Sequence, residues 1–62
     1  MKTQKINEKD LMKTYNDFRH YGEFVSREDY EKLCITKISF KYQGKTALFV
    51  MEYGKVIRGY YI

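Results

Sequence analysis

Apolar positions recur with two different periods along the chain, and the change falls near residue 35. In the first half the apolar residues lie at i, i+4 and i+7, the spacing of one helical face: Leu11, Tyr15 and Phe18. Asn7 is a good N-cap, and Gly22 is placed to end the helix in the left-handed conformation. The pattern predicts a helix over residues 8–21, after a polar segment, residues 1–6, that we expect to fray.

A second, shorter helix is expected over residues 27–33. Ser26 stands three residues before Asp29, which is a variant of the capping box that starts many helices. The apolar residues that follow share a helical face at i, i+3 and i+4: Tyr30, Leu33 and Cys34. We therefore expect this helix to bury Cys34 and its two neighbours.

From residue 35 the period becomes two, the period of a half-buried strand. Gly44 and Gly54 mark the turns between successive strands. The pattern predicts three strands: 35–42, 46–52 and 56–62. The chain is thus expected to form a single small α+β domain, residues 1–62, with two N-terminal helices packed on one face of a three-stranded antiparallel β-meander, in the order ααβββ.

A two-residue turn at Gln43 and Gly44 decides which side chains of the first two strands share a face. One face collects the larger apolar residues, so we expect the helices to pack there: Ile38, Phe40, Ala47, Phe49 and Met51. The opposite face carries a basic and apolar mixture: Lys37, Ser39, Lys41, Leu48 and Val50. Because both helices are needed on the first side, this second side is left open. We call it the open face.

The third strand has two possible registers, because a slip of one residue exchanges the faces of a strand. If Gly54 and Lys55 form a two-residue turn, Ile57 and Tyr61 join the open face. If residues 53–55 form a three-residue loop, Arg58 and Tyr60 join it instead. We prefer the second register, because an inward Arg58 would need a buried partner that so small a core does not offer.

Charge sharpens the description of the open face. The chain has 12 basic and 8 acidic side chains, a net charge of +4. Residues 1–31 hold six basic and seven acidic residues, whereas residues 32–62 hold six basic residues and one acidic residue. The sheet therefore carries the positive charge, which favours an acidic partner. The candidate partner-binding residues are Lys37, Ser39, Lys41, Leu48, Val50, Arg58 and Tyr60.

Composition excludes several classes of function. A chain of 62 residues buries too little surface to enclose a deep catalytic pocket. One histidine, His20, and one cysteine, Cys34, do not supply the ligands of a usual metal site, and no glycine-rich nucleotide motif occurs. We expect no enzyme activity, cofactor or metal. With no apolar run long enough to span a bilayer and no signal-like start, we expect a cytoplasmic protein that does not enter the membrane.

Three uses of the open face stay open. The first is docking on an acidic surface of another protein, as a small inhibitor or adaptor does. The second is weak, salt-sensitive binding of nucleic acid by the sheet. The third is a homodimer, formed through the open face or through the C-terminal strand as a free edge. A composition rich in Lys, Tyr and Ile with no Pro or Trp is the bias that an AT-rich genome produces, and small standalone regulators are common in phages and mobile elements.

Overall fold

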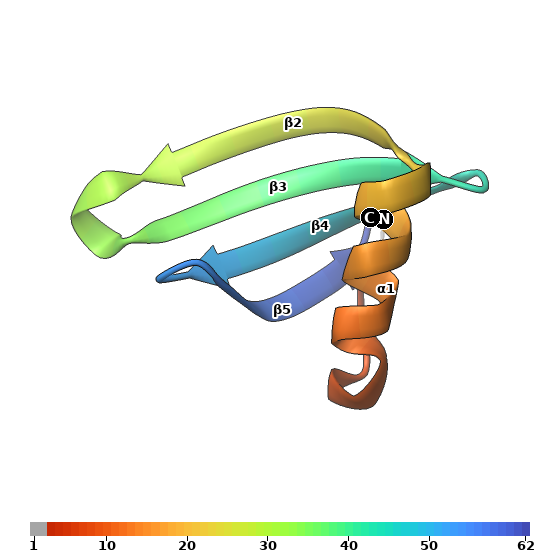
Figure 1. Ribbon diagram of the computed structural model, residues 1–62, viewed down its shortest axis with the longest axis horizontal. Helices are drawn as coiled ribbons and strands as arrows, with labels where there is room; N and C mark the ends of the chain where they lie inside the picture. The colour runs from red at the N-terminus through yellow and green to blue at the C-terminus, as the bar shows by residue number, and fades with distance from the viewer. Residues whose placement is uncertain (1–2) are drawn as a thin grey trace.

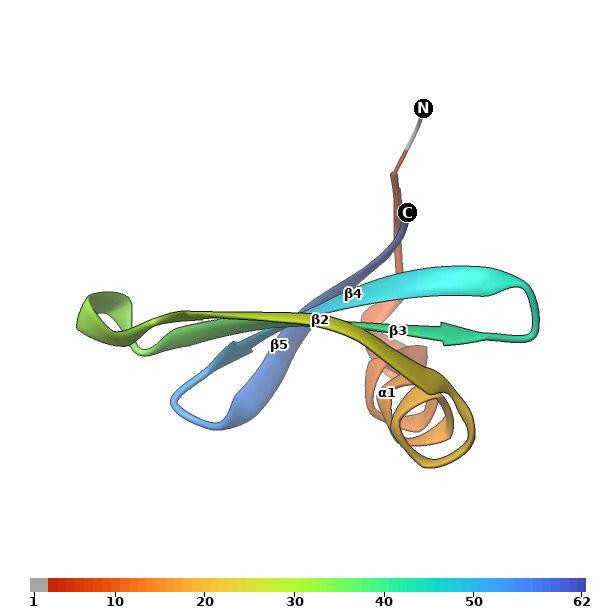
Figure 2. The same cartoon turned by 90° about the horizontal axis from the view of Figure 1, so that it is seen from above.

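The computed structural model describes residues 3–62, in which one α-helix packs on one side of a five-stranded antiparallel sheet (Figures 1 and 2). The strand order is β1-β5-β4-β3-β2, so the helix connects strands at opposite edges of the sheet. Met1 and Lys2 lie outside the described residues. The elements in chain order are β1 (Gln4–Lys5), α1 (Glu8–Tyr21), β2 (Glu23–Tyr30), a 3-10 turn η1 (Glu31–Leu33), β3 (Ile35–Tyr42), β4 (Lys45–Glu52) and β5 (Lys55–Tyr61).

Helix α1 occupies the range over which the apolar spacing predicts a helix. The side-chain oxygen of Asn7 accepts a hydrogen bond from the backbone N–H of Lys9 at 3.2 Å, which caps the first turn. Leu11 and Phe18 are buried against the sheet, and Tyr15 packs beside them. The helix therefore contributes a single apolar stripe to the core.

Gly22 ends α1, but the left-handed conformation expected there is wrong. Its backbone is extended, with φ −88° and ψ 177°, and its N–H donates to the carbonyl oxygen of Phe18 at 2.9 Å. A Cβ at this position would lie 2.5 Å from the Phe18 carbonyl oxygen and 2.8 Å from that of Lys41. Gly22 is thus required by the close approach of two backbone segments and not by a positive φ.

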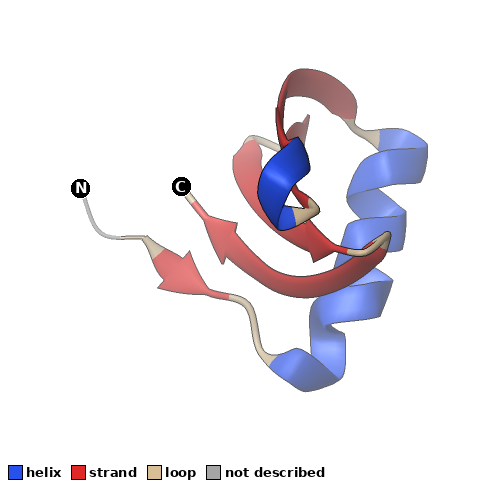
Figure 3. Ribbon diagram, turned by 90° about the vertical axis from the view of Figure 1, so that its left-hand side faces the viewer, coloured by secondary structure: helices blue, strands red, loops and turns tan. Residues whose placement is uncertain are grey.

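The helix expected over residues 27–33 does not form, so the prediction of two helices on three strands is wrong. The segment instead forms β2 and η1, and β2 pairs antiparallel with β3 (Figure 3). A helix of that length has about two turns and is marginal, whereas pairing satisfies the backbone of β3 along its whole edge. Favourable cross-strand pairs support the strand: Glu23 with Lys41, Glu28 with Lys37, and Ser26 with Ser39.

Strands β3 and β4 pair through the turn at Gln43 and Gly44. Phe40 lies opposite Ala47 and Ile38 lies opposite Phe49, the register that a two-residue turn implies. These side chains face α1, where the ring of Phe49 meets the rings of Tyr15 and Phe18 edge-on. The buried core is small and centred on Phe49: Ile6, Leu11, Phe18, Phe40, Ala47 and Phe49.

Strand β5 places Arg58 and Tyr60 on the open face, as the preferred register predicts, but the turn before it differs from the expected one. Tyr53 and Gly54 form a two-residue turn between Glu52 and Lys55, so the expected three-residue loop is wrong. The pairing then shifts by one residue at Ile57, so that Arg58 lies opposite Val50. This β-bulge restores the parity that the shorter turn would have reversed.

Residues 4–6 are part of the fold, contrary to the expectation that residues 1–6 fray; for Met1 and Lys2 that expectation lies outside the described residues. Lys5 pairs with Tyr60, and the Ile6 N–H donates to the Gly59 carbonyl oxygen at 2.8 Å. The Ile6 side chain is buried in the core, only 4% exposed. Strand β1 therefore covers the C-terminal half of β5, which is not the free edge that the sequence suggested. The outer edge of β2, at the other side of the sheet, has no neighbouring strand within residues 3–62.

Candidate functional site

The open face of the sheet lies opposite α1, and no other part of residues 3–62 covers it (Figure 2). Leu48 lies opposite Tyr60, and Val50 lies opposite Arg58. Leu48, Val50 and Tyr60 therefore form an apolar centre, with Arg58 beside it. Leu48, Val50 and Tyr60 are partly exposed, and the Arg58 side chain is exposed. The strand pairing thus brings together four of the seven candidate residues on β4 and β5.

The remaining candidate residues lie on β3 and differ in access. Lys37 and Lys41 are exposed, and the Lys37 ammonium lies 5.5 Å from the centre of the Tyr30 ring, a cation–π contact. Ser39 is only 4% exposed, and its hydroxyl is hydrogen-bonded to that of Ser26 at 3.0 Å. Ser39 therefore ties β2 to β3 and is too buried to contact a partner.

Strand β2 changes the charge of the open face. Glu23 lies opposite Lys41 and Glu28 opposite Lys37, so each β3 lysine has a carboxylate across the strand pair. The hydroxyl of Tyr30 donates to Glu28 at 2.6 Å, and this hydrogen bond raises the pKa of Tyr30. The positive charge of the β3 side is accordingly offset by these two acids, of which Glu28 was expected in a helix and Glu23 in the segment before it.

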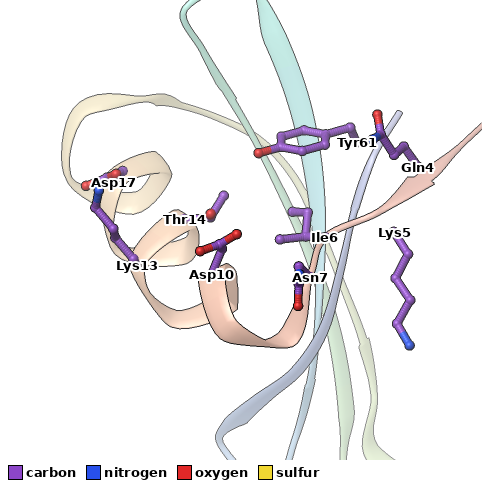
Figure 4. A pocket seen from close by; sticks show the side chains of 9 residues that line it. All are labelled: Gln4, Lys5, Ile6, Asn7, Asp10, Lys13, Thr14, Asp17 and Tyr61. Carbon is purple, nitrogen blue, oxygen red and sulfur yellow. The ribbon is translucent and has the colours of Figure 1, made fainter.

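The β4, β5 and β1 side of the open face keeps its positive charge. Lys5 lies opposite Tyr60, so its side chain belongs to this face, beside Arg58 two residues along β5. Figure 4 shows Lys5 extending away from the acidic residues of α1. Lys5 was missed because residues 1–6 were expected to fray. The centre of the face is therefore an apolar group, Leu48, Val50 and Tyr60, flanked by Lys5 and Arg58.

A second uncovered surface lies on the helix side of the sheet. Helix α1 crosses one end of the sheet, while the β2–β3 and β4–β5 turns extend past it (Figure 1), and the β4–β5 turn curls toward the side of α1 (Figure 2). Two adjoining hollows of about 320 and 610 Å³ lie there and share Tyr15, Arg19, Met51 and Gly54. We call them the helix-side groove; the other lining residues are Met12, Arg27, Thr36, Ile38, Phe40, Lys55 and Val56.

Three basic residues line the helix-side groove: Arg19 on α1, Arg27 on β2 and Lys55 on β5. The pairing of Lys55 with Glu52 places the Lys55 side chain on the open face. The carboxylate of Asp29 lies 3.2 Å from Arg27 Nε. The Thr36 hydroxyl donates to the same carboxylate at 2.7 Å, and this bond together with Arg27 holds the pKa of Asp29 below its ordinary value. The groove was missed because the expected second helix would have covered this part of the sheet.

A polar hollow of about 360 Å³ lies between β1 and α1 (Figure 4). Asp10 and Asp17 lie about two turns apart on α1, with Lys13 on the turn between them, and the Tyr61 ring closes one side. Charges of both signs are mixed here, so the hollow does not present one type of ligand group. Within residues 3–62 no three His, Cys, Asp or Glu side chains are grouped so that they could hold a metal ion.

Cys34 and His20 are both exposed and lie in different parts of the chain. The burial expected for Cys34 is wrong, because the residue caps η1 in the left-handed conformation, with φ 54°, at the turn into β3. His20 packs edge-on against Tyr21 in the last turn of α1. None of the helices in the described chain has the length and apolar character needed to cross a membrane.

Comparison with known proteins adds no family to this description. The chain matches no protein-family model, and neither the curated proteins nor the solved structures include a significant match. The functional interpretation therefore depends on the two uncovered surfaces and their charges.

Proposed function

We propose that this protein is a small non-enzymatic binding domain that docks on an acidic surface of another protein through the open face. The observation that carries the proposal is the apolar centre on β4 and β5, which is partly exposed and flanked by cations. Tyrosine and arginine supply much of the binding energy in protein interfaces, because they combine contact area with directional donors. Tyr60 and Arg58 stand in these roles beside Leu48 and Val50.

A protein partner suits this face better than nucleic acid. A surface that binds phosphates neutralises them with Lys and Arg and keeps carboxylates away. Here Glu23 and Glu28 lie opposite the two lysines of β3, and Glu52 lies opposite Lys55. A protein surface with a few acidic side chains around an apolar patch can match such a mixture, whereas a continuous phosphate backbone would meet the acids.

The proposed place of action is the cytoplasm, and the proposed mode is that of an inhibitor or adaptor, which acts by covering a surface of its partner. Cys34 supports this location, because it is exposed and unpaired with another cysteine of the chain. Exposed free thiols persist in the reducing cytoplasm and are oxidised outside it.

The experiment compares three immobilised proteins in affinity capture from a nuclease-treated lysate of the cell that encodes the chain. They are the wild type, a double variant of the open face, Lys5→Glu with Arg58→Glu, and a control with the same change of net charge on α1, Lys9→Glu with Lys13→Glu. All four lysine and arginine side chains are exposed. We expect the wild type and the control to capture the same protein and the open-face variant to lose it.

Equal capture by all three proteins would contradict the use of the open face. A partner that the wild type captures from an untreated lysate but not from the nuclease-treated one would favour the nucleic-acid alternative. A wild type that sediments as a dimer, and becomes monomeric in Val50→Lys, would favour the homodimer alternative. Circular dichroism of each variant checks that the fold is retained.

A further inference from the structure

The two edges of the sheet differ in length. At one edge β1 has two residues, whereas at the other edge β2 has eight. Within residues 3–62 no strand pairs with the outer side of β2, and no segment lies over it in Figures 1 and 2. All eight residues of β2 are exposed. Backbone N–H and C=O groups along such an edge point away from the sheet, and the element that satisfies them is another β-strand.

A β-bulge divides this edge. The pairing of β2 with β3 shifts between Phe24 and Ser26, so Val25 has no partner on β3. From Ser26 to Tyr30 the pairing is continuous. A bulge bends its strand and interrupts further pairing. The regular part of the edge is therefore residues 26–30, and Glu28 is its middle residue.

The geometry of an antiparallel sheet restricts how two copies of β2 can pair. Two identical strands placed side by side in this way are related by a twofold axis perpendicular to the sheet. Side chains directly opposite each other point to the same side of the sheet, whereas neighbours along a strand point to opposite sides. A register must therefore place one residue opposite its own copy. With Glu28 in that place, every residue of the regular segment is paired, and Ser26 lies opposite Tyr30 of the second copy.

This register also matches charges across the axis. Arg27 lies opposite Asp29 of the second copy, and Asp29 lies opposite Arg27 of that copy. Within one chain Arg27 Nε donates to both carboxylate oxygens of Asp29 at 3.2 Å, and the two side chains are 58% and 47% exposed. The dimer would thus form a ring of four alternating charges without breaking the pair in either chain.

The neighbouring registers match the charges less well. With Arg27 on the axis, two guanidinium groups are opposed and Asp29 meets the bulged Val25. With Asp29 on the axis, two carboxylates are opposed and Arg27 meets Glu31, which belongs to η1 and not to the strand. Like charges directly opposite each other are destabilising. The Glu28 register also opposes one like pair, but only this register sets opposite charges on both sides of it.

We propose that β2 pairs antiparallel with β2 of a second copy, about a twofold axis at Glu28, and so joins two five-stranded sheets into one. Charged residues on an edge strand prevent its pairing with most other strands, and on β2 they leave its own copy as a complementary partner. The axis is perpendicular to the sheet, so both open faces look to the same side. The dimer would present two copies of the apolar centre. This inference goes beyond the proposed function and does not depend on it.

The test uses two variants, Arg27→Asp and Asp29→Arg, studied separately and as an equimolar mixture. Each variant alone has like charges at both positions, so its homodimer would oppose like charges and its chain would lack the Arg27–Asp29 pair. In a mixed dimer both positions again face opposite charges across the axis, while neither chain regains an internal pair. The mixture therefore separates pairing between chains from pairing within a chain.

Sedimentation equilibrium at concentrations up to about 1 mM detects even a weak dimer. A reductant is present, because Cys34 is exposed. We expect the wild type to dimerise, each variant alone to dimerise about tenfold more weakly, and the mixture to form a dimer with nearly the wild-type affinity. Arg58→Asp makes the same charge change on the open face as Arg27→Asp makes on β2, and it should leave the dimer unchanged.

Hydrogen exchange gives a second measurement that needs no variant. Outward-pointing backbone amides of residues 26–30 should exchange more slowly at high than at low protein concentration, whereas those of β1 should not change. The proposal is overturned by a wild type that is monomeric at about 1 mM, or by a mixture that stays as monomeric as its components. It is equally overturned by a dimer that persists in both β2 variants and is lost in Arg58→Asp or Val50→Lys, since the open face would then form it.

Discussion

The two ends of the sheet face that carries α1 are built by the same strands but differ in cover. Where α1 crosses, Ala47 and Phe49 have no exposed surface and Phe40 is only 6% exposed. Two positions further along the same strands, Ile38 and Met51 face the same side and are partly exposed. The alternation of apolar residues is the same at both ends. Burial is therefore set by the reach of the helix and not by the pattern of the strand.

The covered end of this face should therefore contribute more to stability than the uncovered end. The covered end holds the aromatic core, in which the ring of Phe49 contacts those of Tyr15, Phe18 and Phe40. The uncovered end keeps part of its apolar surface exposed. Substitutions at the covered end should lower stability, whereas substitutions at the uncovered end should leave the fold nearly intact.

The largest expected effect is that of Phe49→Ala, compared with Met51→Ala two residues away. Removing a fully buried aromatic ring costs about 3–5 kcal/mol, and the total stability of a 62-residue domain is only about 3–9 kcal/mol. Phe49→Ala should thus be largely unfolded at 25 °C, while Met51→Ala should lose about 1 kcal/mol. Urea denaturation followed by circular dichroism measures both, and equal losses would contradict the difference between the two ends.

A smaller effect is expected from Gly59→Ala at the covered end. A Cβ there would lie 2.9 Å from Leu11 Cδ1 and 3.0 Å from side-chain carbons of Ile6 and Phe49. Overpacking of this kind costs about 1–3 kcal/mol. Gly54→Ala is not a suitable control, because Gly54 has a positive φ. Thermal unfolding of the variant and the wild type measures the change. An unchanged melting temperature would show that the core beside β5 has room for the added methyl group.

At the far tip of the uncovered end, Cys34 should react freely with a thiol reagent. Its side chain is exposed, so the rate of native labelling should approach that of the chain unfolded in denaturant. Cys34→Ser should change the stability by less than about 0.5 kcal/mol. Slow labelling of the native protein would instead indicate that Cys34 is buried, as the prediction of a helix over residues 27–33 implied.

The smallest effect concerns Asp29 at the edge of the groove. Thr36→Val removes the hydroxyl that donates to Asp29 and should raise the Asp29 pKa toward its ordinary value of 3.8. Because the wild-type pKa is lowered by folding, the carboxylate stabilises the native state above the unfolded pKa, and this contribution is lost as the pH falls through the folded pKa. An NMR titration of the Asp29 carboxyl follows the change; identical titrations of variant and wild type would show that Thr36 is not the main cause.

Local signals predicted the part of the fold that local contacts form. The spacing of Leu11, Tyr15 and Phe18 indicates α1, and the alternation with the turn at Gly44 indicates the pairing of β3 with β4. The signals for a second helix, at Ser26 and Tyr30, were also local, but they were overridden by pairing with the edge of β3. Such pairing joins residues far apart in sequence, so no short window of sequence contains it.

The same limit explains what was predicted of the functional surfaces. Alternation placed Lys37, Leu48 and Val50 on the open face, and the cost of burying a charge placed Arg58 there. Lys5 and the helix-side groove required knowledge of β1 and of the missing second helix, which come only from long-range packing. The acids of β2 were misplaced for the same reason.

The relaxation of methyl protons by a soluble, uncharged paramagnetic probe tests the division of the helix-facing side most directly. We expect the methyl groups of Ile38, Met51 and Val56 to relax several-fold faster in the presence of the probe than that of Ala47, because only the covered end is shielded by α1. Equal protection of the methyl groups of all four residues would contradict this, and it would mean that a further layer of the chain or a second copy covers the groove.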